Sequence, residues 1–166
     1  MASLIHQLLE ILNEQATRYE ELLGLSEEKR DVVISNDVES LQKITHLENL
    51  IVSQNQKLER KRVAVTEDMA TVLDQKADEL TLSALIELLK DQEEQADLTA
   101  ARDRIKKTLD ALSEINTQNE LLIKNALDYT EYSLNVIRSS ISQAPAYYSS
   151  TGEVFIDEPG IIDTKK

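Results

Sequence analysis

The residues that break helices are confined almost entirely to the end of this chain. Both prolines, Pro145 and Pro159, and two of the three glycines lie beyond residue 142, so residues 1–141 contain no proline and one glycine, Gly24. Inside a helix, glycine costs about 1 kcal/mol and proline about 3 kcal/mol relative to alanine. The sequence therefore predicts long helices up to about Ile141 and a non-helical tail after it.

Composition supports an all-α fold. Charged residues make up 30% of the chain and aromatic residues only 4%, which is typical of long helices and coiled coils, because sheets favour aromatic and β-branched residues. The hydrophobic fraction of 41% is sufficient for a packed core. A length of 166 residues suits one helical domain with a tail.

The net charge and the cysteine content limit the partners and the compartment. A charge of -13 argues against nucleic acid, whose phosphates require a basic surface, and against anionic membranes. The chain has no cysteine, and its first residues lack the basic region and the long apolar run of a signal peptide. We therefore expect a cytoplasmic protein without membrane insertion.

Apolar residues at alternating spacings of three and four predict where the helices lie. Gly24 interrupts the first pattern, but the pattern resumes at Val33, so we expect one helix across it. The expected elements are helices over about 4–34, 38–73, 82–90 and 92–141, forming one helical domain over 1–141, followed by a flexible tail over 142–166.

Capping residues mark several of the expected helix ends. Ser3 is suited to cap the first helix, and Thr81 or Ser83 to cap the short one. Asn36 followed by Glu39 resembles a capping box, and Asp37 is a second candidate for the same role. These signals support the boundaries expected from the apolar pattern.

Short connections make consecutive helices antiparallel, so we expect an elongated antiparallel three-helix bundle or coiled coil with a short bridging helix. At 1.5 Å per residue the long helices would measure roughly 48, 54 and 75 Å. If Leu73 lies level with Asp91, then Val38 lies level with about Ala126. Residues 129–141 would then extend beyond the bundle by roughly 20 Å.

The same alignment places two sets of polar residues at common heights. Glu48 comes level with Asn116, which predicts a buried polar layer that fixes the register of the helices. Basic residues of the second helix also come level with basic residues of the last one. They form either solvated faces with weak ion pairs or a basic belt for an acidic partner; they are Lys57, Arg60, Lys61, Arg62, Arg102, Arg104, Lys106 and Lys107.

The last helix carries more apolar surface than one neighbouring helix can cover. A helix on a single core needs an apolar stripe about 100° wide. Here apolar residues occupy more than one face: Leu121, Leu122, Ile123, Leu127, Tyr129, Tyr132, Leu134, Val136 and Ile137. This pattern indicates either a core position with three neighbours or an uncovered helix end that binds another protein.

The sequence contains no pattern that indicates catalysis or a metal site. His6 and His46 have no partners at ligand spacing, and Lys43 stands where a carboxylate–histidine metal motif needs a glutamate. His6 and Glu10 share a helix face, which is more often a surface contact than half of a site. Phosphate-binding, calcium-binding and nucleophile motifs are missing too. We expect no enzyme, no cofactor and no metal.

Several motifs, taken in order, resemble the flagellar export chaperones of the FlgN type. The short middle helix, Thr81-Leu82-Ser83-x-Leu85-Ile86, is similar to that family, as is the spacing of Asn116-x-x-Asn119-x-x-Leu122-Ile123-x-x-Ala126-Leu127 in the last helix. Earlier motifs agree with the same order: Leu22-Leu23-x-Leu25-x-x-x-Lys29, Asn36-Asp37-x-x-x-Leu41-x-x-Ile44-x-x-x-Glu48 and Leu58-Glu59-x-x-Arg62. The likeness covers roughly residues 5–141.

The resemblance implies a chaperone that holds hook–filament junction proteins before export. It implies that the C-terminal region binds the terminal helix of the cargo and brings it to the flagellar export gate. The expected binding residues are Leu122, Ile123, Ala126, Leu127, Tyr129, Tyr132, Ile137 and Ile141. Tyr147 and Tyr148 are candidates for docking to the gate, or for folding back over the exposed helix.

Two other functions fit the same sequence. A structural coiled-coil protein would form a homodimer or larger homo-oligomer through the last helix. An export chaperone for a different flagellar cargo, such as the filament subunit or the cap, would need the same kind of apolar helix.

Overall fold

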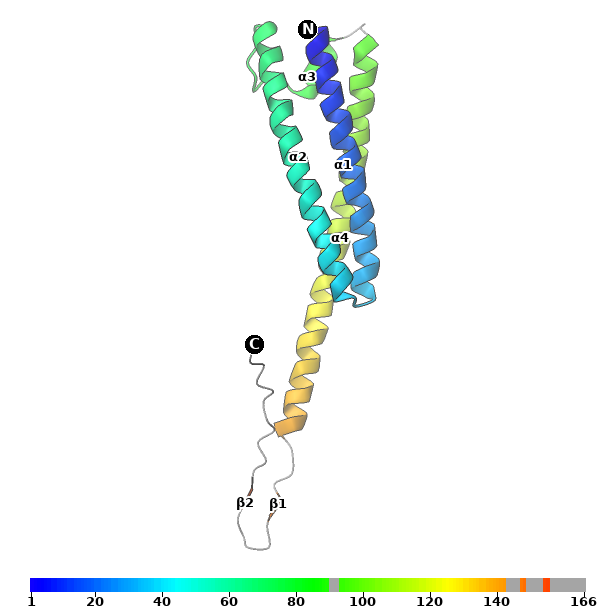
Figure 1. Cartoon of the computed structure of the whole chain (residues 1–166), viewed down its shortest axis with the longest axis vertical. Coiled ribbons are helices and arrows are strands. Elements are labelled where there is room, and N and C mark those ends of the chain that lie inside the picture. The colour runs from blue at the N-terminus through cyan, green and yellow to red at the C-terminus, as the bar shows by residue number, and fades with distance from the viewer. Residues whose placement is uncertain (90–92, 143–146, 149–153, 156–166) are drawn as a thin grey trace. The chain divides into compact units, whose positions relative to one another are not determined.

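The computed structural model describes residues 1–89, 93–142, 147–148 and 154–155 (Figure 1). Its elements are α1 (Ala2–Ile34), α2 (Val38–Val72), α3 (Leu82–Leu88), α4 (Glu93–Ser142), β1 (Tyr147–Tyr148) and β2 (Val154–Phe155). The helices form a bundle, so the prediction of an all-α fold is confirmed. Each helix end lies within two residues of the end expected from the sequence.

The chain divides into two compact units, Met1–Ile123 and Lys124–Lys166, and α4 contributes residues to both. This division falls within α4, earlier than the boundary expected at residue 142. Of the expected tail, the structure describes only Ser142, which ends α4, and the strands β1 and β2, which the sequence did not predict as a pair. They are antiparallel, with Tyr147 opposite Phe155 and Tyr148 opposite Val154.

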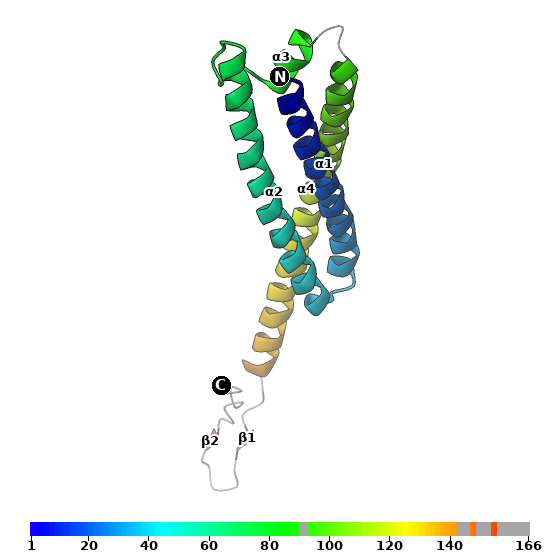
Figure 2. The same ribbon diagram turned by 45° about the horizontal axis from the view of Figure 1, so that its top comes forward.

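In the first unit α1 runs down, α2 runs up and α4 runs down in the views of Figures 1 and 2. Gln15 of α1 donates a hydrogen bond to Glu59 of α2, whereas Ser26, further along α1, meets Glu48, which is earlier in α2. Those two helices are therefore antiparallel. Arg104 of α4 bonds to Glu20 of α1, and Asn119 of α4 bonds to Ser26 of α1. The partners follow the same order along both helices, so α1 and α4 are parallel.

One end of this bundle is closed by α3, which lies beside the start of α1 (Figure 2). The main apolar cluster there draws on all four helices and on Leu80 and Leu89 next to α3: Ile5, Leu8, Leu12, Met69, Ala70, Leu80, Leu85, Ile86, Leu89, Leu98 and Ala101. Burying one large aliphatic side chain contributes about 1.5–3 kcal/mol. The bridging helix α3 thus contributes buried apolar side chains to the core, in addition to connecting α2 with α4.

In the turn between α1 and α2, the residue that caps α2 is Asp37, and the expected capping box that begins at Asn36 does not form. Asn36 does not cap α2; it follows the end of α1 with a left-handed φ of 62°. Its N–H donates to the Val33 carbonyl and that of Asp37 to the Val32 carbonyl, the hydrogen-bond pattern of a Schellman motif. Asp37 is the N-cap, because its carboxylate accepts from the Ser40 N–H at 3.0 Å.

The other helix ends follow the same physical rules. Asp74 ends α2 with φ 53° and repeats the Schellman pattern, its N–H donating to Thr71 and that of Gln75 to Ala70. Thr81 caps α3 by accepting from the Ala84 N–H at 3.1 Å, as one of the two expected residues. The expectation for Ser3 is wrong, because α1 begins at Ala2 and Met1 precedes it without a side-chain cap.

Candidate partner-binding surface

A polar layer joins the three long helices in the middle of the first unit. The Ser26 hydroxyl lies 3.5 Å from Oε1 of Glu48 and 3.4 Å from Oδ1 of Asn116. The Lys29 ammonium donates to Oε2 of Glu48 at 2.7 Å, and both side chains are largely shielded from solvent. The sequence prediction that Glu48 and Asn116 lie at one height is confirmed, and Ser26 is the residue that connects them.

Asn119 completes this layer from α4. Its Nδ2 donates to the backbone carbonyl of Ser26 at 2.7 Å, while its Oδ1 is buried without a hydrogen-bond partner among the described residues. A buried amide with one unmatched oxygen costs stability, but it penalises a shift of the helices that would break the other bond. The layer therefore fixes how α4 is seated against α1 and α2.

Three of the eight basic residues expected at a common height on α2 and α4 form ion pairs with carboxylates. Arg62 pairs with Glu59 at 2.6 Å and Arg102 with Asp103 at 2.9 Å, both within one helix. Arg104 reaches across to Glu20 of α1 at 2.6 Å. The hydrogen bond from Arg104 lowers the pKa of Glu20, and the hydrogen bond from Arg62 lowers that of Glu59.

A groove of about 340 Å³ brings part of the predicted basic belt together. Arg62 of α2 and Arg102 and Lys106 of α4 line it, above apolar side chains that include Tyr19 and Ile105. Glu59 and Asp110 line the same groove, so its charge is mixed. The geometry fits solvated faces with local ion pairs better than a uniformly basic docking site.

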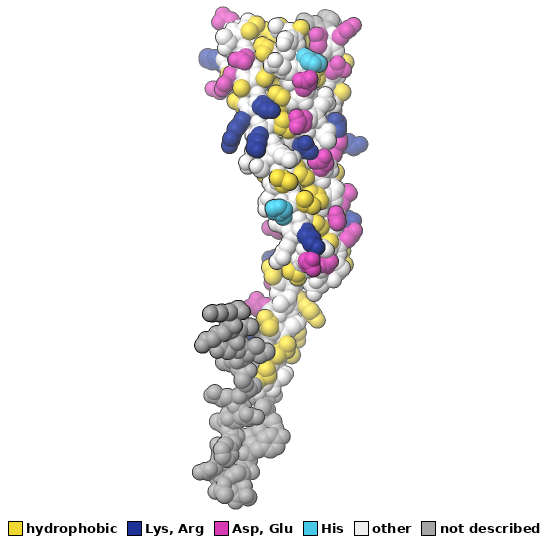
Figure 3. Space-filling view, in the orientation of Figure 1, with side chains coloured by type: hydrophobic (Ala, Val, Ile, Leu, Met, Phe, Trp, Pro, Cys, Tyr) yellow, Lys and Arg dark blue, Asp and Glu magenta, His cyan; other side chains and the backbone are white. Residues whose placement is uncertain are grey.

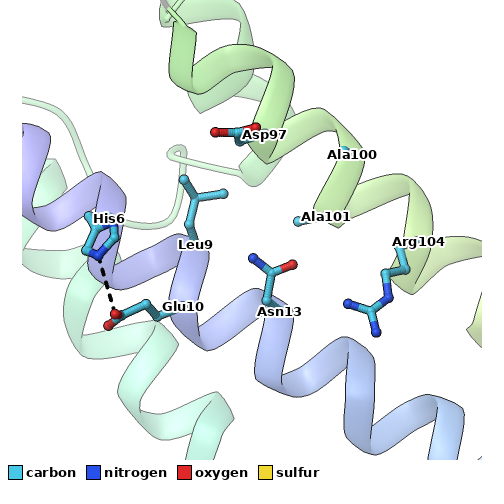
Figure 4. Close-up of a pocket in the computed structure, with 8 residues that line it drawn as sticks. All are labelled: His6, Leu9, Glu10, Asn13, Asp97, Ala100, Ala101 and Arg104. Carbon is cyan, nitrogen blue, oxygen red and sulfur yellow. Dashed lines mark ion pairs between the residues drawn. The ribbon is translucent and has the colours of Figure 1, made fainter.

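A second hollow of about 460 Å³ lies between α1 and the first half of α4 (Figure 4). His6 and Glu10 form an exposed pair at 3.3 Å, and Asp97 extends from the facing helix. Arg104 lines the same hollow and is held by Glu20. No group of three or more potential metal ligands is found among the described residues, so this hollow has the composition of an ordinary helix–helix groove.

In the C-terminal segment of α4 (residues 124–142), unlike in the first unit, most large apolar side chains face solvent. Hydrophobic side chains are visible along part of this segment in Figure 3. Those that are exposed are Leu127 (65%), Tyr129 (72%), Tyr132 (66%), Leu134 (47%), Val136 (44%), Ile137 (54%) and Ile141 (44%). Exposed apolar surfaces of this kind are typical of interaction sites, which makes this segment the candidate partner-binding surface.

The charged residues of this segment keep to one side of the helix. They are Lys124, Asp128, Glu131 and Arg138, which follow one another at spacings of four, three and seven residues. Residues at these spacings share a helix face. The segment is therefore an amphipathic helix whose apolar side is exposed among the residues that the structure describes.

The predicted binding residues are distributed over both units. Leu122 and Ile123 belong to the first unit and are half-buried, as is Ala126 in the second. The other five, from Leu127 to Ile141, are exposed. The prediction omitted Leu134 and Val136, although both are exposed apolar residues of the same segment. A heptad count from Leu127 would have included Leu134.

Two further predicted residues, Tyr147 and Tyr148, form β1 by their backbone, and their side chains lie outside the described part of the chain. A search of the described helices for a stretch long and apolar enough to cross a membrane found none.

The described residues form a helical bundle whose last helix carries an exposed apolar surface. Among known families, the one described as "FlgN protein" matches residues 1–154, which includes the whole bundle and the exposed segment. The chain belongs to the FlgN family, a family of flagellar export chaperones. No curated protein and no solved structure matches the chain.

Proposed function

We propose that this protein is a cytoplasmic chaperone for hook–filament junction proteins, which binds their terminal amphipathic helix on the C-terminal segment of α4. The observation that carries the proposal is the exposed apolar side of that segment, from Leu127 to Ile141, in a member of the FlgN family. An amphipathic helix binds another by burying apolar residues at spacings of three and four.

The physical logic of such a chaperone is simple. A cargo helix that later pairs with other subunits has an apolar face, and this face promotes aggregation or early assembly if it remains in water. Docking it on α4 hides the face without catalysis or ATP. Because each apolar contact contributes only a few kcal/mol, the binding is reversible and the export machinery removes the cargo.

Tyr129 and Tyr132 are the proposed anchors within this surface. Their side chains are the most exposed of the apolar group, at 72% and 66%. Tyrosine combines a large contact area with few rotatable bonds, so it loses little entropy when a partner orders it. We assign docking at the export gate to Tyr147 and Tyr148, which follow the cargo-binding segment in the chain.

The test is a binding measurement on the full chain. The double substitution Leu127→Ser with Ile137→Ser removes two exposed contacts, and we expect it to weaken binding of a junction-protein terminal peptide by about 10- to 100-fold. Isothermal titration calorimetry measures this effect. The control is Ile34→Ser, which changes a residue that is also exposed (66%) but lies at the end of α1.

The outcomes separate the proposal from its alternatives. Equal loss in the control would indicate a general effect on the bundle, and unchanged binding in the double variant would overturn the site. A structural homo-oligomer also fits an exposed apolar helix. It would form a stable oligomer without cargo in sedimentation and would not respond to the peptide. Tighter binding of a filament-subunit or cap peptide would identify the other cargo class.

A further inference from the structure

The C-terminal segment of α4 carries a regular heptad of exposed residues. Leu127, Thr130, Leu134, Ile137 and Ile141 alternate at spacings of three and four, and all five are exposed. In coiled-coil notation Leu127, Leu134 and Ile141 occupy a positions and Thr130 and Ile137 occupy d positions. Tyr129 and Tyr132 fall at c and f positions, on the outer side of the helix, and are left for another part of the cargo. A second helix packed on the seam would contact fixed flanking positions on either side of it.

The two flanks of the seam differ. The e positions are Lys124, Glu131 and Arg138, which are seven residues apart and alternate in charge. The g positions are Ala126, Ser133 and Ser140, which carry no charge. Residues at e and g line the edges of a helix pair and select its partner. One edge of the seam therefore carries the order base–acid–base, and the other edge is neutral.

The charges on this edge are free to meet a partner. Lys124, Glu131 and Arg138 are all exposed, and within the described residues none of them takes part in an ion pair. In the first unit, by contrast, Lys29, Arg62 and Arg104 each have a carboxylate within 2.7 Å. A row of unpaired charges beside an exposed apolar seam is the arrangement that gives a helix–helix interface its specificity.

We propose that the partner of this surface is an amphipathic helix whose flanking residues carry acid, base and acid at seven-residue spacing, opposite Lys124, Glu131 and Arg138. The inference rests on the proposed function and specifies the chemistry of the cargo helix. Because acid–base–acid reads the same in both directions, the requirement holds for a parallel and for an antiparallel partner.

The same charge order selects against a second copy of the chain. In a fully overlapping antiparallel pair of these segments, the e positions face each other, so Lys124 meets Arg138 of the second copy and Glu131 meets Glu131. All three contacts are between like charges, which repel. In a parallel pair the charged edge faces the neutral g positions and gains no ion pair. The pattern therefore favours a different helix over self-association.

Two synthetic peptides of about three heptads test the partner chemistry. Both have leucine and isoleucine at the seam. One carries glutamate, lysine and glutamate at its flanking positions, and the other carries lysine, glutamate and lysine. We expect the first to bind the full chain at least about fivefold more tightly at low salt, with the difference shrinking as salt rises.

A charge-reversed chain provides the matched control. Lys124→Glu with Glu131→Lys and Arg138→Glu should invert the preference between the two peptides. Equal binding of both peptides to both chains would overturn the inference and leave the proposed function intact. Failure of both peptides to bind would overturn the inference too. If the junction-protein peptide of the first test also fails, the proposed function falls with it.

Self-association gives an independent readout. The pair Glu131→Gln with Arg138→Glu converts two repulsive contacts of the antiparallel pair into attractive ones, between Lys124 and position 138. We expect this variant to dimerise more strongly than the parent in analytical ultracentrifugation. Its control is Glu131→Gln with Arg138→Gln, which removes repulsion and adds no attraction. Equal dimerisation in the two variants would show that these charges do not govern pairing.

Discussion

The two halves of α4 differ in which side chains they bury and expose. In the first unit α4 buries apolar residues such as Leu98 and Leu112 together with a few polar ones. The polar side chains that it buries include Thr108, which is 7% exposed, and Asn119, which is 3% exposed. In the C-terminal segment it exposes apolar ones, with Leu127 65% and Tyr129 72% exposed. One continuous helix therefore hides amides and hydroxyls at one end and presents leucine, isoleucine and tyrosine at the other.

The difference separates two uses of a single element. Buried polar groups lower stability, but they penalise wrong helix alignments, and here Asn119 and the Ser26–Glu48 contact fix the register of the bundle. Exposed apolar side chains contribute nothing to the stability of the chain alone, and they become favourable only when a partner covers them. The first half thus holds the register of the bundle, and the second half carries the surface that we propose for binding.

Matched leucine truncations should show the largest contrast. Leu98 is 0% exposed in the core, so Leu98→Ala should lower the free energy of unfolding by about 2–5 kcal/mol. Leu127 is mostly exposed, so Leu127→Ala should change it by less than about 0.5 kcal/mol while weakening cargo binding. Urea unfolding followed by circular dichroism measures both values. Similar losses in the two variants would contradict the division of α4.

Matched lysine substitutions sharpen the contrast for charges. Lys29→Met leaves the shielded Glu48 carboxylate without its ammonium partner at 2.7 Å and should cost about 1–3 kcal/mol of unfolding free energy. Lys124→Met removes an exposed charge and should cost less than about 0.5 kcal/mol. Thermal unfolding of the two variants side by side tests the expectation, and a neutral Lys29→Met would show that the polar layer has little energetic role.

Substitutions that change backbone conformational preference in the first unit should alter its stability and leave cargo affinity unchanged. Gly24 lies within α1, with open space where a side chain would begin, so Gly24→Ala should stabilise by about 0.5–1 kcal/mol. Asn36 has a left-handed φ, so the opposite change, Asn36→Gly, should stabilise by a similar amount of up to about 1 kcal/mol. Chemical denaturation measures both. Cargo affinity should remain that of the parent; a change in affinity would indicate that the bundle and the binding segment are coupled.

Acidification should lower the free energy of unfolding of the first unit. Hydrogen bonds from Ser40 lower the pKa of Asp37 below its usual 3.8, and hydrogen bonds from arginines lower those of Glu20 and Glu59 below 4.5. A depressed folded-state pKa contributes stability above the unfolded value, and this contribution disappears as pH falls through the folded value. Unfolding free energy should therefore decline below about pH 4.5, with a smaller decline in Asp37→Asn. Identical pH profiles would show that the cap contributes no such dependence.

Local patterns in the sequence determined the helices and several of their ends. Spacing of apolar residues predicted four helices. Thr81 and Asp37, which cap α3 and α2, were each one of two candidates, because a short side chain before a helix can accept a backbone N–H. The capping expectations for Ser3 and Asn36 were wrong. Several residues near a helix end have suitable side chains, and the backbone conformation selects among them.

The tertiary structure decided which side chains meet. The sequence placed Glu48 and Asn116 at one height, but the role of Ser26 between them and the pairing of Arg104 with Glu20 depend on how each helix is rotated and shifted against its neighbours. A rotation of one residue turns a helix by about 100° and replaces the face it presents. The sequence showed an excess of apolar faces on α4 and predicted that residues 129–141 extend beyond the bundle. The structure showed that the exposed apolar stretch begins earlier, with Leu127 65% exposed.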